Sequence, residues 1–494
     1  MTTSIEATEP SSATSSPSTD TRWIALVVLS LAQLMVILDS TIVNIALPTA
    51  QQALGFSNDD RQWIVTGYAL AFGSLLPLGG RLGDLFGRKR LFTIGVIGFG
   101  LASALGGAAT GFGLLLIARI AQGVFAAMLA PAALSLVSVT FANSNKERGR
   151  AFGVFGAVSG AGGALGLLLG GVLTQTVSWR WCLYVNVAIA IVAIIGAILW
   201  LRDGERPERV PLDLAGTLTI VAGLVGLVYG LGNAASAGWS DPWTISSLIA
   251  GAVLIVAFVL IERRVVHPLM PLGVLLDRNR GTAYLAVGIT GIGSFAVFLF
   301  LTYYLVDTLH FTPIQSGIAF LPMVAMLIVG AVISGAALMP QFGPRPIVPI
   351  GCGLGAVGLA LLTGIGAHST YAGSVLPALL ALGLGLGLVF GPAQNAATSG
   401  VAAHEVGVAS AMVNTAQQIG GSIGTAVFSS LAASLITSYL STHGPSAVVA
   451  ATLSSDHLVF WVAAGTFVAS GILAALLFRT GPLAVNPDAP AITH

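Results

Sequence analysis

Residues 79–90 read Gly79-Gly80-Arg81-Leu82-Gly83-Asp84-Leu85-Phe86-Gly87-Arg88-Lys89-Arg90 and lie between two long apolar runs. Glycine allows the backbone conformations of a tight turn, and so dense a group of cations is too costly to place in hydrocarbon. The stretch therefore predicts a short hairpin between two membrane spans. Because short cytoplasmic loops collect Lys and Arg, the cations also predict that this turn faces the cytoplasm.

The composition of the chain is that of a membrane protein. Of its 494 residues, 8% are charged and 55% are hydrophobic, whereas soluble domains carry about 25% charged residues. A net charge of +1 gives no indication of nucleic-acid binding. The two cysteines, Cys182 and Cys352, lie in separate apolar runs and predict neither a disulfide framework nor a metal site.

Apolar runs of about 20 residues, the length that crosses a bilayer, recur along the whole chain. They predict fourteen transmembrane helices, at residues 23–47, 62–80, 91–110, 112–137, 151–175, 182–201, 212–232, 243–262, 282–305, 314–338, 347–367, 373–395, 407–436 and 458–478. If both termini are cytoplasmic, Arg61 and Arg180 fall outside and Arg119 falls within a span. All the other Lys and Arg residues fall inside, as the positive-inside rule requires.

An internal repeat divides the chain. The segment Gly79–Lys89 aligns with Gly335–Arg345, and Gly162-Gly163-x-x-Gly166 aligns with Gly420-Gly421-x-x-Gly424. We therefore expect an all-α fold of two six-helix bundles, at residues 21–201 and 282–479, with two inserted helices within 202–281. The Ser-, Thr- and Pro-rich residues 1–20 predict a disordered cytoplasmic tail. Residues 480–494 are expected to form a second cytoplasmic tail. Duplicated halves around a midplane site are typical of secondary transporters.

The pattern Gly80-x-Leu82-x-Asp84-x-x-Gly87-Arg88-Lys89-Arg90 resembles the signature loop between helices 2 and 3 of the major facilitator superfamily. An ordinary basic turn would explain the cations but not an Asp spaced between glycines. With its fourteen spans, the chain from Trp23 to Arg479 resembles the 14-helix drug:proton antiporters of the EmrB/QacA type. The resemblance implies the major facilitator fold.

Two charges lie well inside predicted spans, where each costs at least ~2.5–3.5 kcal/mol. Asp39 belongs to Leu38-Asp39-Ser40-Thr41-Ile42-Val43-Asn44, which resembles the span 1 motif of this family. The resemblance implies a proton carrier, and a static carboxylate that pairs with a cation or caps a helix is the alternative. Asp213 and Asp307 lie near helix ends, and we interpret both as structural charges.

The second intramembrane charge is Arg119, in Ala118-Arg119-Ile120-Ala121-Gln122-Gly123, which resembles the span 4 motif of the superfamily. The resemblance links this arginine to proton movement. Arginine stays ionised in proteins, so Arg119 would influence a carboxylate or hold a hydrogen-bond network and would not carry the proton itself. A structural clamp is an equal alternative, and the sequence leaves a pairing with Asp39 open.

The resemblance also places the 80–90 loop beside the cytoplasmic start of span 13, near Val406–Ala409. A carboxylate at a helix amino terminus is favourable, so we expect Asp84 to latch a cytoplasmic gate in the outward-open state, with Arg88 bracing it. The predicted gating residues are Gly80, Asp84, Gly87, Arg88 and Lys89.

Small residues at intervals of about four positions predict close helix packing in spans 5 and 13. The glycines concerned are Gly156, Gly160, Gly162, Gly166, Gly170, Gly420 and Gly424. Gly163 and Leu167 stand where the antiporter signature of the family has prolines, so antiport is implied less directly than transport. Amides and aromatics within spans are candidates for a substrate cavity, with interhelical hydrogen bonding or packing as their alternative role. These candidates are Asn44, Trp63, Tyr68, Gln122, Phe298, Tyr303, Gln394, Asn395, Asn414 and Gln418.

The predicted function is proton-coupled export of drugs or other lipophilic molecules, many of them cationic, across a bacterial cytoplasmic membrane. The expected partners are a small-molecule substrate, protons and membrane lipid, with no nucleic acid, cofactor or metal, and the protein is expected to be a monomer. A narrow metabolite transporter, working by export or by proton symport, is the alternative on the same fold. The sequence contains no His-Glu-x-x-His and no nucleotide-binding loop, so an enzyme is not expected.

Overall fold

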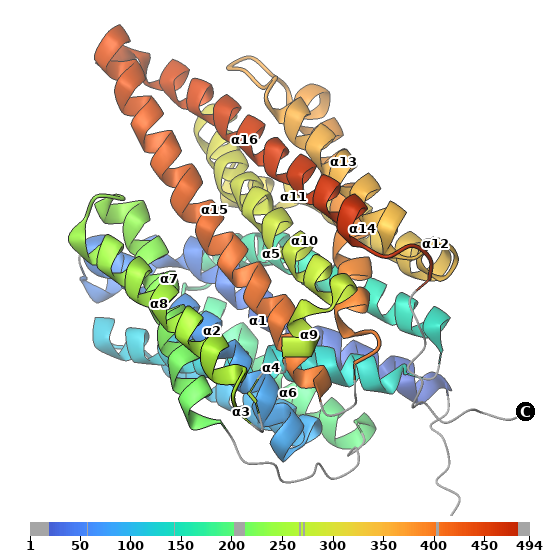
Figure 1. The fold of residues 1–494 in the computed structure, drawn as a ribbon. Helices are drawn as coiled ribbons and strands as arrows, with labels where there is room; N and C mark the ends of the chain where they lie inside the picture. The colour runs from blue at the N-terminus through green and yellow to red at the C-terminus, as the bar shows by residue number, and fades with distance from the viewer. Residues whose placement is uncertain are drawn as a thin grey trace, which may run out of the picture.

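The computed structural model describes residues 19–482, apart from 57, 143, 202–212, 266–267, 270–271 and 402–404. Almost all of the two predicted tails lies outside these residues. Within them the fold consists of α-helices, short π-helical and 3-10 segments and connecting loops, with no β-strand (Figure 1).

The helices fall into a first half, an inserted hairpin and a second half. The first half contains α1 (Thr19–Leu54), α2 (Asn58–Phe86), α3 (Arg88–Gly107), α4 (Phe112–Thr140), α5 (Asn145–Thr176) and α6 (Trp181–Trp200). The hairpin contains α7 (Leu214–Ala237) and α8 (Pro242–Glu262). The second half contains α9 (Leu272–Leu276), α10 (Arg278–Ala296), η1 (Val297–Leu301), η2 (Tyr304–Thr308), α11 (Pro313–Ile333), η3 (Ser334–Leu338), α12 (Met339–Phe342), α13 (Pro344–Leu362), η4 (Tyr371–Val375), α14 (Leu376–Thr398), α15 (Val406–His443), η6 (Pro445–Ala447) and α16 (Val448–Leu477).

The predicted number of membrane spans is confirmed, because 14 helices of the described chain are long and apolar enough to cross a bilayer. Several spans join consecutive elements, as in the single span Ile314–Phe342. The last two helices are longer than predicted, since α15 continues to His443 and α16 begins at Val448. The added residues of α15 are mostly polar, and side chains such as Thr437 bond the carbonyl one turn earlier, so hydropathy alone does not detect them.

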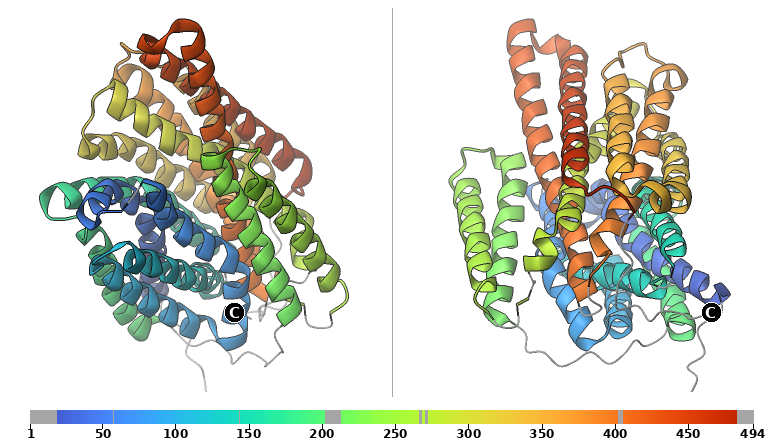
Figure 2. Two further views of the ribbon diagram at one scale, coloured as in Figure 1. Left: turned by 90° about the vertical axis from the view of Figure 1, so that its left-hand side faces the viewer. Right: turned by 45° about the vertical axis from the view of Figure 1, so that its right-hand side comes forward.

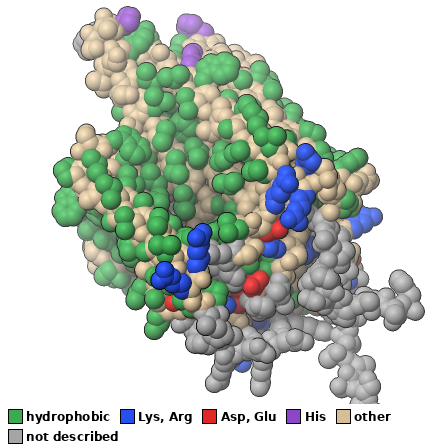
Figure 3. Space-filling view, in the orientation of Figure 1, with side chains coloured by type: hydrophobic (Ala, Val, Ile, Leu, Met, Phe, Trp, Pro, Cys, Tyr) green, Lys and Arg blue, Asp and Glu red, His purple; other side chains and the backbone are tan. Residues whose placement is uncertain are grey.

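The repeat seen in the sequence is present in the backbone. Gly87 (φ 96°) separates α2 from α3, and Gly343 (φ 70°) separates α12 from α13. Both residues adopt the left-handed conformation that glycine tolerates best. The two turns lie at the same end of the molecule as Arg88–Arg90 and Arg345, and we call this the basic end. Figure 3 shows Lys and Arg side chains gathered toward one end of the visible face and the histidines at the other.

Two sets of contacts join the halves: α5 packs against α11 and α14, and α2 packs against α15. Helix α7 contacts both α2 and α15, and Figure 2 shows the hairpin lying along this side of the molecule. The hairpin therefore covers a seam between the halves. Within the hairpin, α8 is the peripheral helix. It packs mainly on α7 and exposes Trp243, Ile249 and Val253.

Candidate functional site

A buried ion pair lies inside the first half of the molecule. Arg119 Nη1, on α4, donates to Asp39 Oδ2, on α1, at 2.5 Å. Asp39 is 0% exposed and Arg119 is 1% exposed. Each charge compensates the burial of the other, and either one alone would be very costly at this position. The pairing that the sequence left open is therefore present.

Gln122 connects the two members of this pair. Its Oε1 accepts a hydrogen bond from Arg119 Nη1 at 2.8 Å. Its Nε2 donates to Asp39 Oδ1 at 2.9 Å and to Ser103 Oγ, on α3, at 2.7 Å. Arg119 and Gln122 share one face of α4 because they are three positions apart. Gln122, a candidate for the substrate cavity, is thus part of the ion-pair site, and its place in a cavity stays a prediction.

Asn186, on α6, is a further partner of Asp39. Its Nδ2 donates to Asp39 Oδ1 at 2.6 Å, and the side chain is fully buried. Among the described atoms its Oδ1 has no hydrogen-bond partner. Neither Asn186 nor Ser103 was predicted from the sequence. A signal for Asn186 was present, since it is the one amide in an otherwise apolar span and a buried amide must find partners.

Tyr68, on α2, forms one wall of the site. The guanidinium carbon of Arg119 lies 4.3 Å from the centre of the Tyr68 ring, a cation–π arrangement that stabilises the buried charge. The Tyr68 hydroxyl donates to the carbonyl of Val36 at 3.3 Å, and Arg119 Nε donates to that of Ile64 at 3.4 Å. Tyr68 thus contacts the ion pair through the face of its ring, and its predicted place in a substrate cavity stays a prediction.

Asp84 joins the halves at the basic end. Its Oδ1 accepts from the backbone N–H of Gly407 at 3.1 Å, and its Oδ2 accepts from that of Val408 at 3.2 Å. Arg88 Nη2 donates to Oδ1 at 3.0 Å. These contacts place a carboxylate at the amino terminus of α15, the favourable end for a negative charge. A side chain at Gly80 would lie 2.6 Å from the Gly407 carbonyl oxygen, so glycine permits the approach.

Arg148 makes a second contact between the halves that the sequence analysis did not predict. From the first turn of α5, its Nη2 donates to the backbone carbonyl of Thr398 at 2.7 Å and to the Thr398 hydroxyl at 3.1 Å. Thr398 is the last residue of α14, and a cation is favourable at a helix carboxyl terminus. Nearby, a Cβ on Gly149 would lie 2.5 Å from the Gly335 carbonyl oxygen. The basic end is thus held closed at two places.

Six of the seven predicted packing glycines lie at helix contacts. Gly162, Gly166 and Gly170 face α1, and Gly420 and Gly424 face α10. Gly156 faces α14, where its Cβ would lie 3.5 Å from Gln394 Oε1, and the contacts of Gly160 are not described. The α5 glycines therefore let α1, which carries Asp39, approach closely.

The aromatic cavity candidates have different surroundings. Phe298 stacks on Phe320 with ring centres 5.6 Å apart and lies opposite Gly163 of the other half, whose Cβ would be 3.4 Å away. Trp63 is 43% exposed and packs on Tyr229 of the inserted hairpin. Tyr303 is half exposed and lies edge-on to a neighbouring phenylalanine. Of these, Phe298 is the one placed between the halves.

Four of the amide candidates lie on helices of the second half, and Gln394, Asn395 and Asn414 are buried. Gln394 and Asn395 lie on α14, and Asn414 Nδ2, on α15, donates to the carbonyl of Ser410 at 3.1 Å. Gln418 lies opposite Gly73 of α2, whose Cβ would be 3.9 Å from that of Gln418. The side chain of Asn44 lies outside the described residues.

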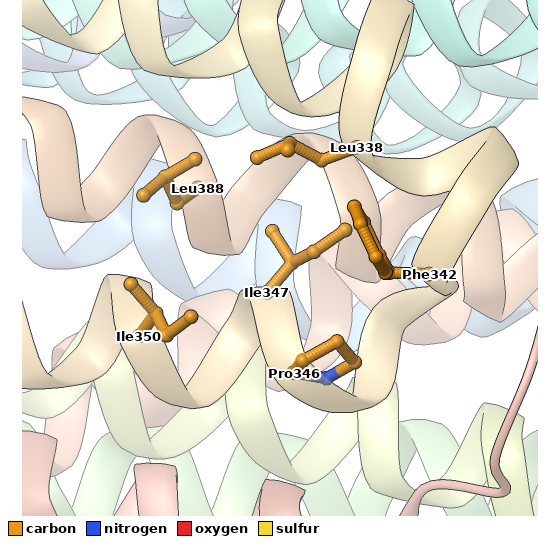
Figure 4. A pocket seen from close by; sticks show the side chains of 6 residues that line it. All are labelled: Leu338, Phe342, Pro346, Ile347, Ile350 and Leu388. Atoms are coloured by element: carbon orange, nitrogen blue, oxygen red, sulfur yellow. The ribbon is translucent and has the colours of Figure 1, made fainter.

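An apolar groove of about 240 Å³ lies on the second half, where α11–α12, α13 and α14 meet. Figure 4 shows its lining, which consists of Leu338, Phe342, Pro346, Ile347, Ile350 and Leu388. Phe342 and Ile350 are more than half exposed. A site that orients a ligand needs a few polar groups among its apolar ones, and this groove has none in its lining, so we do not assign the substrate to it.

The sequence matches the Major Facilitator Superfamily over residues 29–425. It is 47% identical, over 95% of each chain, to the puromycin resistance protein pur8 of Streptomyces alboniger. It is 35% identical to the probable actinorhodin transporter of Streptomyces coelicolor, over 87% of this chain and 78% of that one. It is also 35% identical to the lincomycin resistance protein of Streptomyces lincolnensis, over 83% and 84%.

The fold is also that of a solved structure. The human organic anion transporter MFSD10 superimposes with a TM-score of 0.62 over 92% of this chain and 99% of that one, at 14% sequence identity. At this identity the likeness concerns the fold alone. The extent of the sequence match, the repeated halves and the identity to the bacterial proteins agree, and the chain belongs to the Major Facilitator Superfamily.

Proposed function

We propose that this membrane protein exports antibiotics in exchange for protons, and that Asp39 carries the proton. The observation that carries the proposal is the fully buried Asp39 carboxylate, held by side chains from α4 and α6. An ionisable group inside a membrane span is expensive and is by default a functional residue. The relatives named above for antibiotic resistance or transport support export as the direction.

In this mechanism a proton from outside neutralises Asp39 and removes the charge that holds Arg119. Arg119 stays ionised, so protonation changes the attraction between α1 and α4 without moving a second proton. One proton that enters down 100 mV supplies ~2.3 kcal/mol, and one pH unit adds ~1.4 kcal/mol. Together they allow more than a hundredfold concentration of an uncharged substrate per proton, since each 1.4 kcal/mol is about tenfold.

The basic end is the cytoplasmic gate in this proposal, and both termini lie in the cytoplasm of a bacterial cell. The contact of Asp84 with the start of α15 and the contact of Arg148 with the end of α14 then close the inner side while the substrate is released outside. Opening requires that both contacts break. The protein works as a monomer, because each half supplies one wall of the path.

The test uses inverted membrane vesicles that contain the full chain and are energised to acidify the lumen. Puromycin is the first substrate to try, because the relative at 47% identity is named for resistance to it. We expect puromycin to accumulate in the lumen and to raise the lumenal pH. Asp39→Asn should abolish both signals while the protein stays folded, because an amide cannot carry a proton.

Asp241→Asn is the matched control, since Asp241 caps the amino terminus of α8 and is remote from the ion pair. It should retain both signals. Full gradient-driven transport by Asp39→Asn would contradict the role of this carboxylate. If folded wild-type protein moves no puromycin, the substrate assignment is wrong, and lincomycin is the next compound to test.

A further inference from the structure

We infer that Asn186 is a reversible hydrogen-bond partner of Asp39, whose amide donates to the carboxylate and, after turning over, accepts from the protonated acid. The inference rests on the proposed role of Asp39 as the proton carrier. It assigns to α6, which carries none of the predicted site residues, a part in proton binding.

The groups around the two oxygens of Asp39 decide which oxygen can take the proton. Asp39 Oδ2 faces Arg119, which has only donors, so a proton on this oxygen would point at another donor. Asp39 Oδ1 faces two amide nitrogens, those of Gln122 and Asn186. The network therefore suits the charged carboxylate on both oxygens. A neutral acid also needs an acceptor for its O–H, and one of the two amides must supply it.

Gln122 is poorly placed to supply that acceptor. Its Oε1 is occupied by Arg119 Nη1, and its Nε2 is shared between Asp39 Oδ1 and Ser103 Oγ. If the amide of Gln122 turned over, its nitrogen would face the guanidinium of Arg119, donor against donor. The hydrogen bond to Arg119 would be lost, and this loss would oppose the turn.

Asn186 is free of such ties. Its amide makes one hydrogen bond within the described network, to Asp39 Oδ1, and its Oδ1 lacks a partner there. A half-turn about χ2 exchanges the nitrogen for the oxygen at nearly the same position. The separation of 2.6 Å also lies within the range of O–H···O hydrogen bonds. The unsatisfied oxygen of the charged state becomes the acceptor of the neutral state.

The proton balance of the step is simple. One O–H bond forms on Asp39 Oδ1, the carboxylate loses its charge, and Arg119 keeps its own. Among the described residues, Tyr68 on α2 and Cys182 on α6 are titratable side chains close enough to Asp39 to interact with it electrostatically. Among the described residues, α3 contributes Ser103 and α5 contributes glycines to the surroundings of the pair. Neither residue type has a group that titrates near neutral pH.

The pH dependence of transport in Asn186 variants distinguishes a switching amide from a fixed donor. A fixed donor stabilises only the carboxylate, so its removal would move the pH of half-maximal transport upward. A switching amide stabilises both forms, so in Asn186→Leu the half-maximal pH should move little. The maximal rate of puromycin-driven proton exchange should instead fall about tenfold, which is the fold-change that corresponds to the free energy of one lost hydrogen bond. Asn186→Thr should recover part of the rate, because a hydroxyl can donate or accept.

Infrared difference spectra of the full chain in lipid, recorded between acidic and alkaline pH, test the switch directly. We expect an acid C=O band that is absent in Asp39→Asn and an amide C=O band that is absent in Asn186→Leu or Asn186→Thr. Both bands should titrate with one midpoint. Asn233→Leu removes another hydrogen-bonded amide from a membrane helix, on α7, and should keep both bands and the exchange rate.

Two negative results have different meanings. If the Asp39 band titrates and no Asn186 band follows it, Asn186 is a fixed donor and the inference is wrong. If no Asp39 band titrates in folded, puromycin-transporting protein, the proposed function itself fails at its proton carrier, and the inference falls with it. Either amide variant serves the spectroscopy, so poor folding of Asn186→Leu does not prevent the test.

Discussion

The two halves repeat one fold but not one chemistry. In the first half the Gly87 turn is flanked by Asp84 and Arg88, whereas the matching positions around Gly343 are Pro340 and Pro344. Both glycines keep a positive φ. The shape of the turn depends on glycine alone, and the charged contact depends on side chains that only the first turn has. A duplicated backbone can thus retain its geometry after its chemistry has become one-sided.

The same asymmetry extends to the contacts between the halves. Asp84 reaches the amino terminus of α15, and Arg148 reaches the carboxyl terminus of α14. A negative side chain meets the positive pole of one helix, and a positive side chain meets the negative pole of another. The first half supplies the charges, and the second half supplies backbone poles. Together with the Asp39–Arg119 pair, this makes the first half the place where charge changes should act.

The largest expected effect comes from breaking the buried Asp39–Arg119 pair, which has no counterpart among the described residues of the second half. Arg119→Leu leaves the buried Asp39 carboxylate uncompensated, and loss of one partner of such a pair costs about 3–5 kcal/mol. We expect a markedly lower thermal unfolding temperature in detergent and little folded protein. Asp39→Asn combined with Arg119→Leu should recover most of that stability but no proton-coupled transport. A single variant as stable as wild type would show that the pair is not needed for folding.

A smaller effect should follow from adding bulk at the first turn. Gly80→Val places side-chain atoms against the Gly407 carbonyl and the Ala411 methyl, which a Cβ alone would approach to 2.6 Å. The matching residue of the second half is Ala336, which already has a Cβ, so Ala336→Ser should be tolerated. We expect Gly80→Val to hold the basic end open and to lower export about tenfold or more, if the misfit is of the order of 1–3 kcal/mol.

The measurement for this pair is the labelling of a cysteine introduced at Ser399, beside the Arg148 contact. The native Cys182 and Cys352 are buried, so membrane-impermeant maleimide from the basic end should report the new cysteine. Faster labelling in Gly80→Val than in Ala336→Ser is the expected order. Equal labelling in the two variants would contradict the prediction that added bulk at residue 80 opens the basic end.

The smallest effect should come from neutralising the first turn. Asp84→Asn keeps the shape of the side chain but removes its charge from the start of α15, which is worth ~0.3–2 kcal/mol. We expect a several-fold rise in the same labelling rate at Ser399. Pro340→Ala, at the matching position of the second half, should change it little. An equal response of both variants would mean that the contact is not specific to Asp84.

The sequence predicted those features that hydropathy and turn chemistry encode locally. The fourteen spans, the glycine turn and the isolated charges Asp39 and Arg119 all stand out without knowledge of neighbours. The partners of these charges do not, because the contact of Asn186 with Asp39 depends on how α6 is rotated against α1. Trp63 shows the same dependence, since an aromatic at a helix end fits a cavity or the inserted hairpin equally well until the helices are placed.

The length of α15 and α16 has a practical consequence. At 1.5 Å per residue the 38 residues of α15 extend about 57 Å, well beyond a hydrocarbon core of about 30 Å. Figure 2 shows the two helices rising together past the other elements. Their tip at Gly444 is therefore the end of a rigid lever attached to the second half. Because the displacement of a lever grows with its length, a probe at this tip should report the smallest rotation between the halves.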